Sequence, residues 1–326
     1  MASWRRSWIV ALLVFFLALN RAAVAEPQNE PIPASLSGSS NLYFTSLWEG
    51  IIYCYNASSG TLEKVFKAVT GRISSFDLAG ESGEKLYFTY ADVQSLYLFS
   101  SGSVIEIYKH ETYVRFVRVV LNSQNGKEAV YFSEAYGGGK DGKIYRLVNG
   151  SAELYLVIPR DKVGFWAGCF DIAPDGTIYI TSGNVVPSEI YVIKNNTFKK
   201  LAMYPFPLMG PRYVENVRLE VKGLEVTVAR GLLIAGFNNR TVYLYDLASE
   251  KLYVVYENPD IKRIDDADLL VTAQSLAGGR SETAPMTQLV VSEPMYMGEV
   301  IYVSESTPLK IVILSGGEGG IKDVMY

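Results

Sequence analysis

The chain contains one histidine, His110, and two cysteines, Cys54 and Cys169. So few of these side chains exclude a zinc-type cluster. No serine or cysteine stands at a spacing from His110 that indicates a catalytic triad, so we assign no catalytic residue and the sequence leans against an enzyme. The two cysteines fall at different strand positions in repeats three apart, which predicts two buried thiols and no disulfide.

Basic residues are slightly fewer than acidic ones, with 30 Lys and Arg and 34 Asp and Glu, so the net charge is -4. This balance excludes the basic face that a nucleic-acid partner needs and gives no attraction to anionic lipid. No helical apolar period of useful length follows residue 26, which excludes a helical fold. With 49% hydrophobic and 20% charged residues, the chain nevertheless has enough apolar surface for a large core.

The N-terminus has the three parts of a secretory signal peptide. Arg5 and Arg6 precede an apolar run at 8–19, and small residues follow at 23–25. The run is shorter than the ~20 residues that span a membrane. We therefore expect 1–25 to be removed and the protein to be secreted without stable membrane insertion. The alternative is an uncleaved segment that anchors the protein to a membrane.

Beyond a Pro- and Ser-rich lead-in at 26–40, three apolar runs recur six times in one order, with a period of about 44 to 59 residues. The first run lies at 42–45, 86–89, 130–133, 178–181, 232–235 and 289–292. The second centres on Tyr53, Tyr97, Tyr145, Tyr191, Tyr243 and Tyr302. The third lies at 62–66, 104–108, 152–158, 198–204, 251–256 and 309–314. Short turn sequences between the second and third runs predict β-hairpins.

A fourth, inner strand is predicted ahead of five of these units, at 76–79, 116–120, 170–173, 224–228 and 267–271. The first unit lacks one, but 321–326 has the same order of residues as 76–79. We therefore predict an all-β, six-bladed β-propeller over 41–326, with four-stranded antiparallel blades. Its ring would be closed by the C-terminal strand, which removes an exposed sheet edge.

The phrases FDLA…KLYFTY…SLYLF and FDIAPDGTIYIT…EIYVI resemble six-bladed propellers of the TolB-like superfamily, which includes the NHL, YWTD and SMP-30/gluconolactonase families. The resemblance covers nearly the whole chain after the lead-in and implies architecture rather than activity. YWTD repeats carry an Asp after the Thr, where this chain has Ser46, Tyr90, Glu134, Ser182, Gly236 and Glu293. The lactonases place a metal-binding Asn where this chain has Gly168.

Ligands of propellers usually bind at the mouth of the central channel, which is formed by loops between the first and second runs and loops that enter the inner strands. The candidate binding residues there are Trp48, Glu134, Tyr136, Trp166, Asn184, Arg212, Glu293 and Tyr296. Carboxylates beside amides suit Ca²⁺, so the alternative metal ligands are Glu134, Asp171, Asn184 and Glu293. Arginines beside aromatic rings suit a sugar or an anionic peptide.

Acidic residues recur at one position of the inner strands, namely Asp77, Asp171, Asp268 and Asp323, with Glu225 at that position in the fifth unit. A ring of acids near the channel can hold a cation. The favoured interpretation is that each accepts hydrogen bonds from backbone N–H groups of a neighbouring blade, because buried polar groups need partners.

Four Asn-x-Ser/Thr sequons begin at Asn56, Asn149, Asn195 and Asn239, and all are potential glycosylation sites in an exported protein. Three of them fall in the same hairpin turn of their units, where Asn, Gly and Ser are also favoured for backbone reasons.

Two functions follow from these observations. The first is an extracellular, monomeric, non-enzymatic binding protein without a cofactor, which holds a protein, peptide or glycan at the channel mouth. The second is a Ca²⁺-dependent lactonase or esterase of the SMP-30 kind, which the missing Asn at Gly168 disfavours.

Overall fold

The computed structural model describes most of the chain from Asn41 onward as antiparallel strands joined by short turns. The described residues are 41–46, 50–56, 61–68, 73–79, 85–90, 93–121, 128–134, 141–160, 163, 169–183, 186–221, 224–236, 241–257, 266–271, 287–293, 299–304, 310–317 and 320–321. Among them, no helix is long and apolar enough to cross a membrane.

The strands form six sheets, four of which have four strands, while one has three and one has five. The three-stranded sheet contains β1 (Asn41–Ser46), β2 (Ile51–Asn56) and β3 (Thr61–Lys67). The second sheet contains β4 (Ile73–Ala79), β5 (Lys85–Tyr90), β6 (Ser95–Ser100) and β7 (Ser103–Lys109), and the third contains β8 (Val114–Leu121), β9 (Glu128–Glu134), β10 (Gly142–Val148) and β11 (Ser151–Ile158). The fourth sheet contains β12 (Phe170–Ile172), β13 (Ile178–Thr181), β14 (Ser188–Lys194) and β15 (Thr197–Tyr204). The fifth contains β16 (Met209–Val221), β17 (Leu224–Gly236), β18 (Thr241–Asp246) and β19 (Leu252–Glu257). The last sheet contains β20 (Asp266–Val271), β21 (Thr287–Glu293), β22 (Glu299–Ser304), β23 (Lys310–Gly317) and β24 (Gly320–Ile321).

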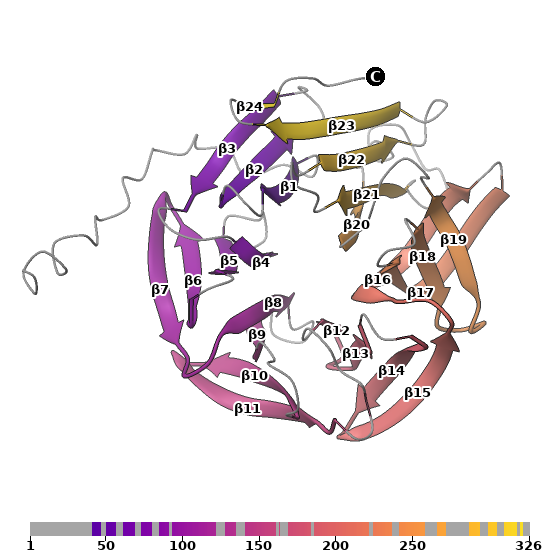
Figure 1. Ribbon diagram of the computed structural model, residues 1–326, viewed down its shortest axis with the longest axis horizontal. Coiled ribbons are helices and arrows are strands. Elements are labelled where there is room, and N and C mark those ends of the chain that lie inside the picture. Colours follow the sequence, from indigo (N-terminus) through magenta and orange to yellow (C-terminus); the bar gives the residue numbers. More distant parts are fainter. Residues whose placement is uncertain are drawn as a thin grey trace, which may run out of the picture.

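The sheets stand around a common centre in a propeller-like arrangement (Figure 1). In each four-stranded sheet the first strand lies nearest the centre and the last strand lies at the rim. Neighbouring first strands contact one another, since β4 meets β8, β8 meets β12, β12 meets β16, and β16 meets β20. The three predicted runs of every unit fall on strands, so the repeat found in the sequence is confirmed at the level of the sheets.

The predicted inner strand at 224–228 is wrong. It is the first part of β17, which pairs with β16 in an extended hairpin, while the last six residues of β17 also pair with β18. The first strand of this sheet is β16. Gly231, where the pairing with β18 begins, does not adopt a left-handed conformation, so no turn divides β17 there.

The predicted closure by the C-terminal strand is not seen in the described residues. Gly320 and Ile321 pair with Gly317 and Gly316 of the preceding β23, and not with β1. The register leaves only two residues between β23 and β24, so the chain turns straight back onto the strand before it. Residues 322–326 lie outside the described part of the chain.

A β-bulge recurs where the last two strands of a sheet pair. In the first five sheets along the chain the register shifts between the residue before the repeat tyrosine and that tyrosine, at Ile52/Tyr53, Leu96/Tyr97, Ile144/Tyr145, Ile190/Tyr191 and Val242/Tyr243. A bulge twists a strand and disrupts its ladder, which hinders pairing with a foreign strand. The outer edges of these sheets are thereby protected.

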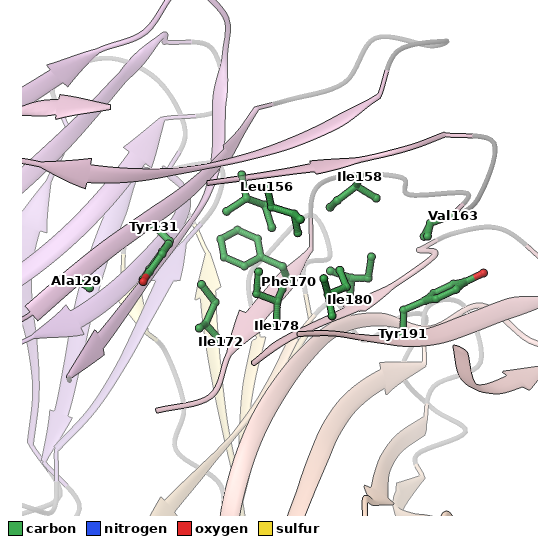
Figure 2. Packing of buried hydrophobic residues seen from close by; sticks show 12 residues of the cluster. Ala129, Tyr131, Leu156, Ile158, Val163, Phe170, Ile172, Ile178, Ile180 and Tyr191 are labelled. Atoms are coloured by element: carbon green, nitrogen blue, oxygen red, sulfur yellow. The ribbon is translucent and has the colours of Figure 1, made fainter. Parts of the chain in front are cut away.

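Most of the described core is formed between neighbouring sheets. Figure 2 shows Leu156 and Ile158 of β11 beside Phe170, Ile178 and Ile180 of the next sheet. Phe170, Ile158 and Ile180 have no exposed surface. Alternation along each strand therefore places β-branched and aromatic residues on the faces that stack.

The prediction for the cysteines is confirmed where the structure describes them. Cys169 is buried and forms no disulfide, and it packs against Met209. The side chain of Cys54 lies outside the described part of the chain.

Gly231→Ala is expected to lower the free energy of unfolding by about 1–3 kcal/mol, the usual range for overpacking. A Cβ at Gly231 would lie 2.9 Å from the carbonyl oxygen of Tyr245 and 2.9 Å from Val228 Cγ1, so the paired strands must shift. Urea unfolding measures the change. Gly102→Ala is a comparison in which the strain comes from its φ of +77° alone, because its Cβ would meet nothing within 4 Å. A Gly231→Ala variant as stable as the natural chain would contradict the close packing at Gly231.

Candidate functional site

Charged residues of alternating sign occupy one register position on successive first strands. Asp77 lies on β4, Arg118 on β8, Asp171 on β12 and Arg212 on β16. In the strand register, each lies opposite the second residue of the first apolar run, which is on the next strand. The pairs are Asp77–Tyr87, Arg118–Tyr131, Asp171–Tyr179 and Arg212–Leu233. We call these four charged side chains the channel cluster, because first strands lie nearest the centre (Figure 1).

The channel cluster is joined by ion pairs. Arg118 Nε lies 3.4 Å from Asp171 Oδ1, and the two side chains are only 5% and 9% exposed. Arg212 Nη1 lies 3.7 Å from Asp77 Oδ1, although β16 and β4 belong to sheets that are not consecutive along the chain. The two acids and two bases therefore compensate each other's charge.

The acids of the channel cluster also bind backbone N–H groups of the strand across the sheet boundary. The N–H of Val119 donates to Asp77 Oδ2 at 2.8 Å, and the N–H of Tyr213 donates to Asp171 Oδ2 at 2.5 Å. The prediction that these acids accept backbone hydrogen bonds from a neighbouring sheet is thus confirmed for Asp77 and Asp171. The side chains of Asp268 and Asp323 lie outside the described part of the chain.

Glu225 does not belong to this position. It lies on the hairpin extension of β17, is exposed, and accepts a hydrogen bond from Arg218 Nη2 at 2.7 Å. Its assignment to the ring of acids is wrong for the same reason that 224–228 is not an inner strand. In the sheets that lie between the acidic ones, the same register position holds Arg118 and Arg212.

Burial raises the pKa of Asp171, and the charges of Arg118 and Arg212 and the N–H of Tyr213 oppose that rise. Both of its carboxylate oxygens already face a donor or a cation, so they are poor candidates for a Ca²⁺ site. Among the described side chains, no group of three His, Cys, Asp or Glu is placed to hold a metal. Of the alternative metal set, Asn184 and the side chain of Glu293 lie outside the described residues.

A second group of polar side chains surrounds Glu134, at the end of β9. Glu134 Oε1 accepts from Tyr145 OH at 2.6 Å and lies 2.9 Å from His110 Nε2. Lys143 Nζ lies 3.5 Å from Glu134 Oε2, and Tyr108 OH lies 3.2 Å from His110 Nδ1. These five side chains come from β7, β9, β10 and the loop that enters β8, and we call them the rim network.

Both ring nitrogens of the only histidine are used inside the rim network. Because a carboxylate only accepts, His110 Nε2 donates to Glu134, and Nδ1 forms a hydrogen bond with Tyr108 OH. The centroid of the His110 ring lies 4.7 Å from that of Tyr145 and 5.6 Å from that of Phe132, both in edge-to-face geometry. With 9% of its surface exposed, the His110 ring is held in place by these contacts.

Acid should weaken the rim network. Burial acts to raise the pKa of Glu134, but the hydrogen bonds from Tyr145 and His110 and the charge of Lys143 outweigh it, so the pKa lies below its usual value of 4.5. A carboxyl whose folded-state pKa is depressed stabilises the fold above the unfolded pKa and loses that contribution as pH falls through the folded pKa. We expect the urea midpoint of the natural chain to fall more steeply between about pH 5 and pH 3 than that of Glu134→Gln. Parallel curves would contradict this assignment.

The structure describes the side chains of two of the eight predicted mouth residues, Glu134 and Arg212, and places them in separate groups, the rim network and the channel cluster. The others lie outside the described residues, wholly or in their side chains, namely Trp48, Tyr136, Trp166, Asn184, Glu293 and Tyr296. Arg118 and Tyr145 were not predicted as site residues. Arg118 lies in the predicted inner strand 116–120, but one residue further along that strand than the acids in 76–79 and 170–173, so the sequence did not align it with them.

Comparisons with known proteins agree with the arrangement of the sheets. No family model and no curated protein matches the sequence. Among solved structures, a luciferin-regenerating enzyme is 11% identical with a TM-score of 0.53, over 88% of this chain and 92% of that one. An auxiliary nutrient binding protein from Bacteroides thetaiotaomicron is 10% identical with a TM-score of 0.52, over 78% of this chain and 64% of that one.

A third solved structure is the PQQ-bound form of an aldose sugar dehydrogenase from Streptomyces coelicolor. It is 13% identical with a TM-score of 0.50, over 82% of this chain and 95% of that one. These neighbours include both enzymes and a binding protein, and likeness at such identities carries no activity across. What it shows, together with the sheets around a common centre, is that this chain folds as a β-propeller.

Proposed function

We propose that this protein is an exported, non-enzymatic binding protein that holds a protein, peptide or glycan at the channel mouth. The observation that carries the proposal is that the acid–base groups of the rim network and the channel cluster are engaged with protein partners. His110 and Glu134 bind each other at 2.9 Å, and the acids of the channel cluster face arginines and backbone N–H groups. A general base needs a free acceptor atom for the substrate's proton, and a metal ligand needs a free atom for the metal.

The proposal includes a six-bladed ring. It is supported by six sheets in which consecutive strands are neighbours, although one has three strands and one has five, and by the bulge that recurs at the same position in five of them. Export is supported by the signal-like segment at 1–25, and a monomer by the protected outer edges. The metal-dependent hydrolase is the weaker hypothesis, because both oxygens of Asp171 are already engaged.

Two exposed, described side chains lie in connections on the same face of the propeller as the mouth loops. Tyr113 is 49% exposed and precedes β8, and Arg160 is exposed and follows β11. Both lie in connections that enter a first strand. An aromatic ring and a guanidinium on one face suit a sugar ring, a carboxylate or an anionic peptide.

The test measures binding and hydrolysis with the same preparation. Purified protein is analysed for bound metal, screened for lactone and ester hydrolysis with and without chelator, and probed on peptide and glycan arrays. We expect array ligands whose affinity falls at least about tenfold in a Tyr113→Ala, Arg160→Ala double variant, or by about 1.4 kcal/mol. Lys251→Ala, an exposed substitution in a turn on the opposite face, is the matched control. Hydrolysis that chelator abolishes would overturn the proposal in favour of the hydrolase.

A further inference from the structure

Two of the four sequons lie in hairpin turns of the same geometry. Asn149 and Gly150 form the turn between β10 and β11, with φ of 50° and 77°, and Val148 pairs with Ser151. Asn195 and Asn196 form the turn between β14 and β15, with φ of 50° and 59°, and Lys194 pairs with Thr197. Positive φ at both central residues is the mark of a type I′ turn, in which Asn is favoured.

These turns present the whole sequon to solvent. Asn149, Gly150 and Ser151 are exposed, and so are Asn195, Asn196 and Thr197. A Cβ placed on Gly150 would meet nothing within 4 Å, so the space around the tip of that turn is open. Both turns join a third strand to a fourth, which places them on the same face of the propeller, opposite the connections that carry Tyr113 and Arg160.

The sequon at Asn239 differs in its hydroxyl residue. Thr241 is the first residue of β18, is only 5% exposed, and has an interaction partner inside the protein. In the folded chain, a transferase that recognises the hydroxyl two residues after the asparagine can reach it at Ser151 and Thr197 but not at Thr241. The side chain of Asn56 lies outside the described residues.

We infer that Asn149 and Asn195 are N-glycan acceptors and that Asn239 is not. The inference rests on the proposed export, since only an exported chain meets the transferase. In the reaction, Nδ2 of the asparagine forms a bond to the anomeric carbon of a glycan carried on a lipid phosphate. The bond from that carbon to the phosphate oxygen breaks, the lipid phosphate leaves, and Nδ2 gives one proton to a base of the transferase.

A glycan at Asn149 would lie at the start of β11, which carries large hydrophobic side chains on its surface. Leu154 and Val157 are 54% and 39% exposed, and Tyr155 is 37% exposed. A hydrated chain of sugars shields such side chains from other molecules. The acceptor turn is thus placed where it keeps the protein soluble without touching the channel mouth.

The structure also provides a turn in which an acceptor can be created. Ser101 and Gly102 form the corresponding turn between β6 and β7, with φ of 51° and 77°, and Ser103 follows. Ser101→Asn completes an Asn-Gly-Ser sequon in a turn that already has the geometry asparagine favours, so the fold should tolerate it.

The experiment expresses the full chain, with its own N-terminal segment, in a secretory host that glycosylates Asn-x-Ser/Thr, and determines site occupancy by mass spectrometry of peptides. We expect occupancy at Asn149 and Asn195 to be far above that at Asn239. Asn149→Gln and Asn195→Gln should each remove one glycan mass, Asn239→Gln none, and Ser101→Asn should add one. Ser101→Asn combined with Ser103→Ala is the matched control and should add none.

Two failures are distinguishable. Secreted protein with bare Asn149 and Asn195, or with a glycan at Asn239 in their place, would overturn this inference and leave export intact. Full-length protein found only inside the cells, with the segment 1–25 still attached, would overturn the proposed export and the acceptor sites with it.

Discussion

Asp171→Ala is expected to lower the free energy of unfolding by about 3–5 kcal/mol, the range for breaking a buried ion pair from one side. The substitution leaves the buried guanidinium of Arg118 without its carboxylate and the N–H of Tyr213 without its acceptor. Urea unfolding with a constant m value measures the loss. We expect the first strands to be affected before the rim, because β12 contacts both β8 and β16.

Asp175→Ala is the matched control for that prediction. Asp175 lies four residues further along and forms an ion pair with Lys194 at 2.9 Å, but both side chains are more than half exposed. Its loss should cost no more than about 1 kcal/mol. A double variant, Asp171→Leu with Arg118→Met, should recover much of the stability, because the buried pair is then replaced by apolar side chains. A single Asp171→Ala variant as stable as Asp175→Ala would refute the role of the channel cluster.

Glu134→Ala should cost about 2–4 kcal/mol, because the buried His110 and the half-buried Tyr145 lose the oxygen that they share. Tyr145 OH and His110 Nε2 both lie within hydrogen-bonding distance of Glu134 Oε1. Glu134→Gln keeps an acceptor at that place and should cost less. Thermal and urea unfolding at neutral pH measure both changes.

The matched control in this case is Glu189→Ala on β14. The carboxylate of Glu189 also accepts from a tyrosine and a lysine, Tyr191 and Lys200, but its side chain is 20% exposed, compared with 12% for Glu134. Lys200 is itself half-exposed, and only one buried donor, Tyr191 OH, loses its acceptor, so we expect a smaller loss of about 1–2 kcal/mol. Equal losses at Glu134 and Glu189 would mean that the rim network adds nothing beyond surface ion pairing.

Most of the strands could be predicted from the sequence because each is a short apolar run bounded by turn residues. The tyrosines of the second run marked third strands reliably, as at Tyr97, Tyr145 and Tyr243. The continuity of β17 could not be predicted, since Gly231 is typical of a turn and the alternation along β16 is interrupted by Pro211 and Asn216.

The site was harder to predict than the fold. Acids at one strand position could be found by aligning the repeats, and their backbone partners could be inferred from the need to satisfy buried carboxylates. The arginines that interleave them could not be recognised as partners, because Arg118 and Arg212 lie in strands whose sequences differ from the acidic ones. The rim network escaped prediction because His110, Glu134 and Tyr145 meet only when the strands and a loop are assembled.

The sign of the charge alternates from one first strand to the next. Five consecutive first strands carry Asp77, Arg118, Asp171, Arg212 and Asp268 at one register position, so acid and base alternate from sheet to sheet. Duplicating or deleting one repeat would set two like charges side by side at the centre, whereas two repeats together would preserve the order. The unit in which such a protein can grow or shrink is therefore the pair of neighbouring repeats, one acidic and one basic at its inner strand.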